Sequence, residues 1–594
     1  MIFGRHINRY YLRYAVPFIV GLLTLVAVDY LQLLIPNLYQ MLINGINTGS
    51  VTVAGETVPF DMNFLVDRIC MPIVLIVVSV TVGRFVWRIM FFGSAIRAAD
   101  DMRRRMFSVA KDLSREYYQV NKVGSMMSLF TNDLETIRES LGWGIMMFFD
   151  AVFLCVLAVG KMWRMSPTLA LLSLAPMLLL LAAATVVGKY MMDKWERRQE
   201  VFSQLSDFSQ ESFSGIAVIK AFVKEARELM AFKKLNADNE KANVDHTKAS
   251  VLLRILIMLF AESVVCIILG YGGYLVWSGV FNAGQLIEFI GYFQSIVWPI
   301  MAVSELIDMT SRGKASLKRV SKLLDETPAV KDREGAVPAG EIKGGIEFRD
   351  LSFRYPDGEF DALSGVSFRI EPGEHVGIVG KTGSGKTTIV ELILRVYNVG
   401  DGMLFIDGRD VNGLTIRSVR DGIAYVPQDN FLFSDTIERN IAFSVDGSVD
   451  HKIVEQAAVL SDVDGNISEF EEGYETVLGE RGVTVSGGQK QRISIARALM
   501  KDAPILILDD SVSAVDTGTE KTILDNLKES RSGRTTILIA HRISTIERMD
   551  KIIYVDDGRV TAVGTHEELL GICPDYRKTV ELQRLEEEGG GRDA

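Results

Sequence analysis

Residues Gly380-Lys381-Thr382-Gly383-Ser384-Gly385-Lys386-Thr387 follow an apolar run, His375 to Val379, that predicts a strand. They open a run, Thr387 to Val396, that predicts a helix. Glycines at this spacing let backbone N–H groups surround phosphate groups, while the lysine reaches the β and γ phosphates and the threonine hydroxyl ligates Mg²⁺. The segment therefore predicts a P-loop, with Lys386 on the phosphates and Thr387 on the metal.

A second apolar run, Ile505 to Leu508, ends in two aspartates, Asp509 and Asp510. An aspartate that follows a buried strand beside a P-loop is placed to hold magnesium, directly or through water, and we assign this role to Asp509. From Ile346 onward, short apolar strands alternate with helical patterns, which is typical of an α/β domain. We predict a nucleotide-binding domain over 346–575, followed by a charged C-terminal tail over 576–594.

The composition points to an apolar part joined to a polar part. The chain has 594 residues, of which 48% are hydrophobic and 23% charged, with a formal net charge of −11. A mean hydropathy of +0.20 is unusual for a uniformly soluble protein with this charge content. The absence of a concentrated basic patch disfavours nucleic-acid binding. The four cysteines show neither a disulfide framework nor a metal-binding spacing.

The first half of the chain contains six long apolar runs. A membrane span needs about 20 mostly apolar residues, and so many runs in one half argue against buried core helices. We predict an all-α transmembrane domain over 1–312, with six spans at Tyr14–Pro36, Phe64–Phe92, Leu141–Gly160, Thr168–Val187, Val251–Trp277 and Leu286–Ile307.

Lysine and arginine in the loops predict the orientation of the spans. Basic residues are frequent at the N-terminus and in the stretches between spans two and three and between spans four and five. The loops after spans one and five have none. Both termini are therefore expected in the cytoplasm. Lys161 and Arg164, between spans three and four, break the rule and are treated as a local exception.

Two long polar stretches, Ile96–Asp112 and Asp193–Lys248, have no proline and carry apolar residues at helical spacing. We predict that they continue the spans as helices into the cytoplasm. Residues 313–345 are expected to be a linker between the domains, because the character of the chain changes after about Arg312 and Ser321 to Gly345 is rich in charge, glycine and proline.

A family resemblance rests first on Ser486-Gly487-Gly488-Gln489, which is preceded by Val485 and followed by Lys490-Gln491-Arg492. This string resembles the signature motif of the ABC ATPases. Other marks of the family occur in order: Tyr355 resembles the aromatic residue that stacks on adenine, Gln428 the glutamine that links magnesium to the membrane domain, Ser513–Asp516 the loop that crosses the dimer interface, and His541 the switch histidine that contacts the γ-phosphate.

The resemblance implies ATP and Mg²⁺ as cofactors, bound between two subunits in a head-to-tail dimer. Nucleotide contacts are expected from Tyr355, from Gly380 to Thr388, and from Ser486, Gly487, Gly488 and Gln489 of the opposite subunit. Metal contacts are expected from Thr387, Gln428 and Asp509, and catalytic roles for Asp510, His541 and Gln428.

The membrane half also resembles exporter-type ABC half-transporters, through Thr131-Asn132-Asp133 and Gly215 to Phe222. That family implies two coupling helices that touch the ATP domains, expected near Tyr117–Lys122 and near Ser214–Phe222. Glu480-Arg481-Gly482 resembles the loop with which exporters sense the opposite membrane domain.

Asp510 departs from the family pattern, in which a glutamate at this position orients the attacking water. Aspartate is one methylene shorter, so its carboxylate lies about 1 Å further back, and a misplacement of about 1 Å can cost about 100-fold in rate. Harmless variation remains open. The interpretation we favour is a degenerate site in a heterodimer, whose partner is a second half-transporter with a glutamate at that position.

The expected function is ATP-driven export of hydrophobic or amphipathic compounds, drugs or lipids, across the lipid bilayer of a bacterial cytoplasmic membrane. An exporter-fold importer of a chelated metal or vitamin remains open, as does a sensor without transport. The six spans argue against a soluble ABC ATPase. Charged residues within the spans are costly, so Asp29 and Glu262 are expected to face a cavity, with an ion pair inside the bundle as the open alternative for Asp29, Arg84, Arg88, Asp150, Glu262 and Glu288.

Overall fold

The structure, a computed structural model, describes residues 3–53, 56–447, 449–479, 482 and 485–590. Its internal contacts divide the chain into two compact units. The first comprises Met1–Ser108 and Gly124–Asp325, and the second comprises Val109–Val123 and Glu326–Ala594. The short segment Val109–Val123 therefore groups with the C-terminal unit, although its neighbours in the chain on both sides belong to the first.

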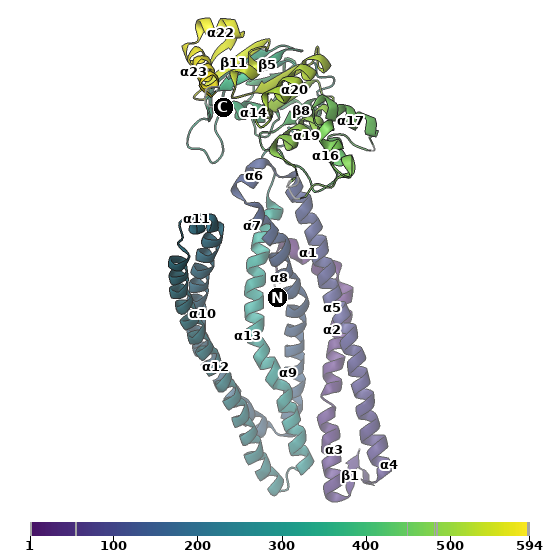
Figure 1. The fold of residues 1–594 in the computed structure, drawn as a ribbon. Helices are drawn as coiled ribbons and strands as arrows, with labels where there is room; N and C mark the ends of the chain where they lie inside the picture. Colours follow the sequence, from purple (N-terminus) through teal and green to yellow (C-terminus); the bar gives the residue numbers. More distant parts are fainter. Residues whose placement is uncertain (1–2, 54–55, 448, 480–481, 483–484, 591–594) are drawn as a thin grey trace. The chain divides into compact units, whose positions relative to one another are not determined.

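The first unit is built of helices (Figure 1). Its helices are α1 (Arg5–Arg13), α2 (Ala15–Gln32), α3 (Ile35–Thr48), α4 (Met62–Phe64), α5 (Met71–Asp112), α7 (Val123–Ser128), α8 (Leu134–Glu139), α9 (Ile145–Met165), α10 (Pro167–Ser214), α11 (Ile216–Ala221), α12 (Glu225–Trp277) and α13 (Ala283–Asp325). A hairpin of β1 (Ser50–Val53) and β2 (Glu56–Pro59) follows α3, and π-helical turns occupy Leu65–Cys70, Leu129–Asp133 and Ser140–Gly144.

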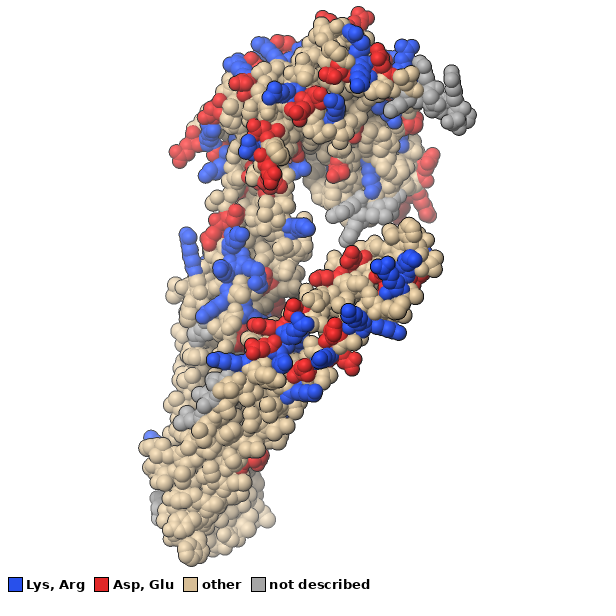
Figure 2. Space-filling view, turned by 90° about the vertical axis from the view of Figure 1, so that its left-hand side faces the viewer, with Lys and Arg blue, Asp and Glu red and all other residues tan. Residues whose placement is uncertain are grey.

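Five helical stretches in the described part of the chain are long and apolar enough to cross a membrane: Ala15–Thr48, Met62–Asp112, Val123–Met165, Glu225–Trp277 and Ala283–Asp325. They contain five of the six predicted spans. The remaining one, Thr168–Val187, lies within the continuous helix α10, whose described apolar part, Pro167–Met177, is shorter. On the face shown in Figure 2, a broad part of this unit carries few charged side chains, as expected for a lipid-facing surface.

The predicted charges within the spans have different surroundings. Asp29 is only 2% exposed and lies close to Asp150 and Arg84. Asp29 is therefore buried in the bundle beside a second acidic residue, and the described residues show no salt bridge for it. Glu262, in contrast, is exposed in the single chain.

Lys161, the exception to the loop-charge rule, has partners inside the bundle. Its ammonium group lies 5.9 Å from the ring centroid of Tyr30 and 5.3 Å from that of Tyr292. The hydroxyl of Tyr292 donates to Glu288 at 2.6 Å, so a carboxylate completes the network. Lys161 is thus held by cation–π contacts and is a poor indicator of topology.

The two polar stretches predicted as helical extensions are helical. Ile96–Asp112 is the end of α5, and Asp193–Lys248 forms the end of α10, all of α11 and the start of α12. Helices α10 and α12 run side by side, with α11 at their tip (Figure 1). Three apolar side chains at this tip, Ile216, Val218 and Phe222, are exposed within the single chain.

The residues expected to begin the linker are helical. Helix α13 continues to Asp325, because Leu317, Val320 and Leu323 recur at helical spacing and are buried within the first unit. The polar residues between them conceal this pattern. Non-helical chain therefore begins at Glu326 and not at residue 313.

The second unit is an α/β domain that also contains α6 (Arg115–Val120). Its strands are β3 (Ile346–Phe353), β4 (Leu363–Ile370), β5 (His375–Gly380), β6 (Leu404–Ile406), β7 (Arg409–Asp410), β8 (Ile423–Val426), β9 (Ile505–Asp509), β10 (Thr535–Ile539), β11 (Lys551–Asp556) and β12 (Arg559–Gly564). Its helices are α14 (Lys386–Ile393), α15 (Ile416–Asp421), α16 (Ile437–Ala442), α17 (His451–Leu460), α18 (Asp464–Ser468), α19 (Gly487–Met500), α20 (Thr517–Ser530), α21 (Ile543–Ile546), α22 (His566–Ile572) and α23 (Pro574–Gly590), with 3-10 turns at Val411–Gly413 and Gly473–Glu475.

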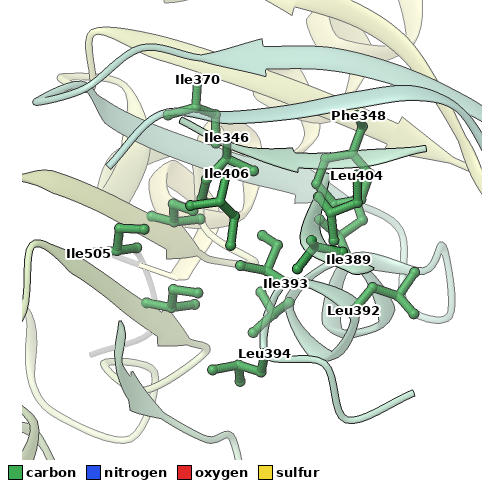
Figure 3. Close-up of a cluster of buried hydrophobic side chains, with 14 of the residues drawn as sticks. Ile346, Phe348, Ile370, Ile389, Leu392, Ile393, Leu394, Leu404, Ile406 and Ile505 are labelled. Atoms are coloured by element: carbon green, nitrogen blue, oxygen red, sulfur yellow. The ribbon is translucent and has the colours of Figure 1, made fainter. Parts of the chain in front are cut away.

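Two sheets form this unit. The larger has the order β12-β11-β5-β10-β9-β8 and is parallel except for β12, and the smaller, β4-β3-β6-β7, is antiparallel. Both sheets contribute to one hydrophobic core around α14, in which Phe348, Ile370 and Ile406 of the smaller sheet lie toward Ile389 and Ile393 of the helix (Figure 3). This core fixes the helix that follows the P-loop.

The C-terminal segment, expected as a charged tail, forms helix α23 as far as Gly590. Tyr576 anchors it, because its side chain is fully buried in the core of the larger sheet and its hydroxyl lies 2.7 Å from Nδ1 of His566. Tyr576 and Val580 are the apolar side chains of this segment that pack into the core.

Candidate functional site

The P-loop and the predicted metal and catalytic residues gather at one edge of the larger sheet. Strands β8, β9, β10 and β5 are adjacent and parallel, so their carboxyl ends lie together. Gln428 follows β8, Asp509 ends β9, His541 follows β10, and the P-loop follows β5. Ligands of open α/β sheets bind at this edge, where loops converge and backbone groups are left unpaired.

The P-loop begins and ends as predicted, although its helix is shorter than expected and ends at Ile393. Gly385 has φ +97°, and a Cβ atom there would lie 2.7 Å from Cδ2 of Leu363, so glycine is required. The ammonium group of Lys386 donates to the carbonyls of Gly380 at 2.9 Å and of Lys381 at 2.8 Å. Burial lowers the pKa of Lys386, while the nearby carboxylates of Asp509 and Asp510 oppose this shift.

A cavity of about 310 Å³ lies over the loop. It is lined by Tyr355, Ala362, Thr382, Gly383, Ser384, Gly385, Lys386, Thr387, Thr388, Gln428, Asp509, Asp510, Ile539 and His541. Nearly all predicted nucleotide contacts of this chain are therefore brought together, with Gly380 and Lys381 at the base of the loop. The buried hydroxyl of Ser384 has no hydrogen-bond partner among the described residues, which suits a loop that binds an anion.

Thr387 and Asp509 face each other across this cavity, with Thr387 Oγ1 donating to Asp509 Oδ1 at 3.3 Å. Tyr425 donates to the other oxygen of Asp509 at 3.5 Å. Burial raises the pKa of Asp509, and these hydrogen bonds oppose the shift. A hydroxyl, a carboxylate and the amide oxygen of Gln428 are the hard oxygen donors that Mg²⁺ prefers, so the residues fit this ion.

Asp510 has an unusual backbone conformation, and its carboxylate lies between two other residues of the predicted site. Its φ is +48°, in the left-handed region, where its N–H donates to Ile539 O at 3.0 Å. Its carboxylate oxygen Oδ2 lies 3.4 Å from Nε2 of Gln428 and 4.0 Å from Nε2 of His541. The other two residues predicted for catalysis, Gln428 and His541, thus both approach one carboxylate oxygen of Asp510.

Sequence reasoning missed two charged residues beside the cavity. The hydroxyl of Tyr355 lies 2.8 Å from Thr388 Oγ1 and donates to Glu391 Oε2 at 3.0 Å. Glu391, buried in α14, forms an ion pair with Arg115 of α6. Helix α6 is the short helix expected near Tyr117–Lys122, and the buried glutamate inside an apolar helix was the signal that could have revealed the pair.

Comparison with known proteins identifies both halves of the chain. Residues 18–300 match the family described as ABC transporter transmembrane region, and residues 363–513 match ABC transporter. A probable multidrug resistance ABC transporter ATP-binding/permease protein of Bacillus subtilis, YheI, is 34% identical over 99% of this chain and 98% of its own length.

The chain belongs to the ABC transporter family.

A multidrug resistance-like ATP-binding protein of Escherichia coli, MdlA, is 34% identical over 96% of this ABC transporter and 94% of its own length. The solved structure of a bacterial Atm1-family ABC exporter with ATP bound has a TM-score of 0.77, 25% identity, and 97% and 98% coverage of the two chains. The predicted fold class, a helical membrane domain fused to an α/β ABC domain, is thereby confirmed, as is the resemblance to exporter-type half-transporters.

The ABC signature lies outside the cavity formed by this chain. Ser486 is the N-cap of α19. It forms a capping box with Gln489, in which the backbone N–H of Gln489 donates to Ser486 Oγ at 3.3 Å. Gln491, for which no role was predicted, donates to Asp510 O at 3.5 Å and accepts from Ala514 N at 3.0 Å. It thereby connects the signature helix to the loop after β9.

Of the expected sensing loop in this ABC transporter, Glu480 and Arg481 lie outside the described residues. Gly482 is described and has φ +67°. The second coupling segment, expected near Ser214–Phe222, corresponds to α11 in the first unit.

Proposed function

We propose that this ABC transporter exports hydrophobic or amphipathic compounds, drugs or lipids, across the cytoplasmic membrane of a bacterium. The observation that carries the proposal is one chain in which membrane-length apolar helices are joined to a cavity that collects a P-loop, an acidic pair and a histidine. The names of the relatives, which describe multidrug resistance proteins and an exporter, favour export over import. The distribution of basic residues supports cytoplasmic termini.

In this proposal ATP lies over the P-loop, with Lys386 on the β and γ phosphates and Tyr355 against adenine. Thr387, Asp509 and Gln428 hold Mg²⁺, which neutralises phosphate charge when bound. His541 contacts the γ-phosphate and Asp510 orients water. The contacts of Asp510 with Gln428 and His541 support a common role for the three residues.

Turnover in this proposal requires a dimer in a head-to-tail arrangement. The signature residues Ser486–Gln489 do not line this chain's cavity, so they are available to a second subunit. The shorter side chain of Asp510 supports a partner of a different kind, a half-transporter with a glutamate after its Walker B aspartate. The functional parts are a membrane domain, predicted over 1–312 and continued by α13 to Asp325, a connection as far as 345, an ATP domain over 346–575 and a C-terminal segment over 576–594.

The test of export uses inside-out membrane vesicles that contain the complete transporter. A hydrophobic fluorescent dye should accumulate inside these vesicles when ATP and Mg²⁺ are added, and Lys386→Ala should abolish the accumulation. ATP-driven depletion of a preloaded compound from the same vesicles indicates import and overturns the proposal. ATP hydrolysis without movement of any tested compound, in vesicles that hold a gradient, favours a sensor.

A further inference from the structure

The side chain of Gln583, in α23, forms hydrogen bonds with the backbone of His541 and of Ile543, the two residues that flank Arg542. Its Nε2 donates to the carbonyl oxygen of His541 at 2.6 Å, and its Oε1 accepts from the N–H of Ile543 at 2.8 Å. The assignment of the two amide atoms is unambiguous, because a carbonyl only accepts and an N–H only donates. One side chain therefore makes two hydrogen bonds to the loop between β10 and α21, and we call this pair of hydrogen bonds the bracket.

The other restraints on this loop lie on either side of His541: Ala540 and Ile543 are buried in the core, and Arg542 forms an ion pair with Glu520 at 3.7 Å. Helix α21 has only four residues, and its N-cap, Arg542, provides no side-chain hydrogen bond to the helix. The first N–H groups of a helix need partners, and Gln583 supplies one for Ile543. The side chains of His541 and Arg542 are themselves exposed.

The bracket is attached to a firmly docked helix. Tyr576, Val580 and Gln583 lie on one face of α23 at helical spacing, and the first two pack into the core of the larger sheet. The ring of Tyr576 makes an edge contact with Tyr554 of β11, with centroids 5.9 Å apart. Through Gln583, the segment that carries His541 is thus held to a helix that is fixed on the sheet.

We propose that Gln583 is a positioning residue for the switch histidine, so that the C-terminal helix sets the geometry at the γ-phosphate. The inference rests on the γ-phosphate role proposed for His541. The amide side chain carries both the donor and the acceptor that these bonds need, whereas a carboxylate cannot donate to the His541 carbonyl and an ammonium group cannot accept from the Ile543 N–H. Sequence reasoning treated this region as a charged tail.

The test compares the affinities of this chain's own P-loop for ATP and ADP, which differ by the phosphate that His541 contacts. Photolabelling of the complete complex with azido-ATP is competed with ATP or with ADP, and the label on this chain is quantified after electrophoresis. Gln583→Met is close in shape but makes neither hydrogen bond. It should reduce the preference for ATP over ADP by about 2- to 10-fold, the usual effect of one net hydrogen bond. Glu581→Met, at an exposed position of the same helix, should leave the preference unchanged.

Gln583→Glu separates the two halves of the bracket. It keeps an acceptor for Ile543 but places a carboxylate against the His541 carbonyl, so the ATP preference should fall as in Gln583→Met. Hydrogen exchange at the Ile543 amide should accelerate only in Gln583→Met. Unchanged exchange together with an unchanged ATP preference in Gln583→Met, with helix α23 still protected, overturns the inference.

His541→Ala is the reference for the role on which the inference rests. If it lowers the ATP preference while Gln583→Met does not, Gln583 is not a positioning residue. If His541→Ala leaves the preference unchanged, the proposed role of His541 is wrong, and exchange at Ile543 alone decides whether Gln583 holds the loop.

Discussion

Arg115 of α6 and Glu391 of α14, the helix that follows the P-loop, form an ion pair within the second unit. Helix α6, which carries Arg115, begins three residues after the long apolar helix α5 ends. The other oxygen of Glu391 accepts from the hydroxyl of Tyr355, which lines the nucleotide cavity. Two contacts therefore connect the cavity to the chain segment that follows a membrane helix.

Breaking this pair should weaken the link between substrate and ATP turnover. Arg115→Ala leaves Glu391, whose side chain is 5% exposed, without its cation, and we expect the stimulation of ATPase activity by substrate to fall several-fold more than the basal rate. The measurement is the ATPase rate of the reconstituted complex with and without dye. Arg417→Ala, at an exposed ion pair on α15, is the matched control.

A double-mutant cycle tests whether the two residues act as a pair. Because Arg115 is half exposed, their coupling should be modest, about 1 kcal/mol. If Arg115→Ala and Glu391→Gln affect substrate stimulation additively, the pair carries no coupling.

Lys386→Ala should abolish tight ATP binding at this chain's P-loop. The ammonium group already bonds two loop carbonyls beside the cavity, so it is positioned where phosphate oxygens arrive. Site-resolved photolabelling measures the effect, with Lys381→Ala, whose ammonium group pairs with Asp556 at 2.9 Å, as the comparison. Near-normal ATP affinity in Lys386→Ala would refute the assignment.

Asp510 and Ser486 should behave differently in a heterodimer. Asp510→Ala should change steady-state ATPase activity only modestly, because this site is already slow, whereas Ser486→Ala should be far more damaging to the partner's site. Asp510→Glu restores reach to the water and should raise hydrolysis at this site, up to about 100-fold if position alone limits it. The rates are measured on the purified complex in nanodiscs.

The composition of the complex decides how the Asp510 result is read. In a homodimer, Asp510 serves both sites and Asp510→Ala should remove nearly all turnover. A complex that contains only this chain and loses activity in Asp510→Ala shows that the degenerate-site interpretation is wrong.

All four cysteines should be replaceable without loss of transport, but Cys573 calls for alanine. Cys70 and Cys266 are exposed and Cys155 is partly buried, whereas Cys573 is buried in the core near Tyr576. Serine at residue 573 would bury a hydroxyl and should lower stability by about 1–3 kcal/mol, more than alanine does. A cysteine-free variant with alanine at this position that folds but does not transport would contradict the prediction.

Short-range patterns made much of the ATP site predictable. The P-loop, Asp509 and His541 each follow a strand that apolar residues reveal locally, and parallel strands bring their carboxyl ends together. Contacts between distant residues were not predictable in this way: Arg115 and Glu391 are separated by 276 positions, and Gln583 and His541 by 42. A glutamate inside an apolar helix indicates that a partner is needed, but the local pattern does not identify which residue it is.

The ends of helices were also hard to predict. Helix α13 continues beyond the predicted domain end. The prediction missed this continuation because buried residues such as Val320 alternate with many charges. Helix α23 was concealed in the same way, since Tyr576 and Val580 are the few apolar side chains that dock it. In both cases packing against distant elements, rather than composition, decided the outcome.

The exposed tip formed by α11 has a consequence for the production of the transporter in the cell. Ile216, Val218 and Phe222 present apolar surface that the single chain does not cover. Apolar clusters of this kind are what chaperones and proteases recognise on incomplete assemblies. A subunit synthesised in excess of its partner is therefore expected to be degraded, so that subunit abundance in the membrane follows the scarcer chain.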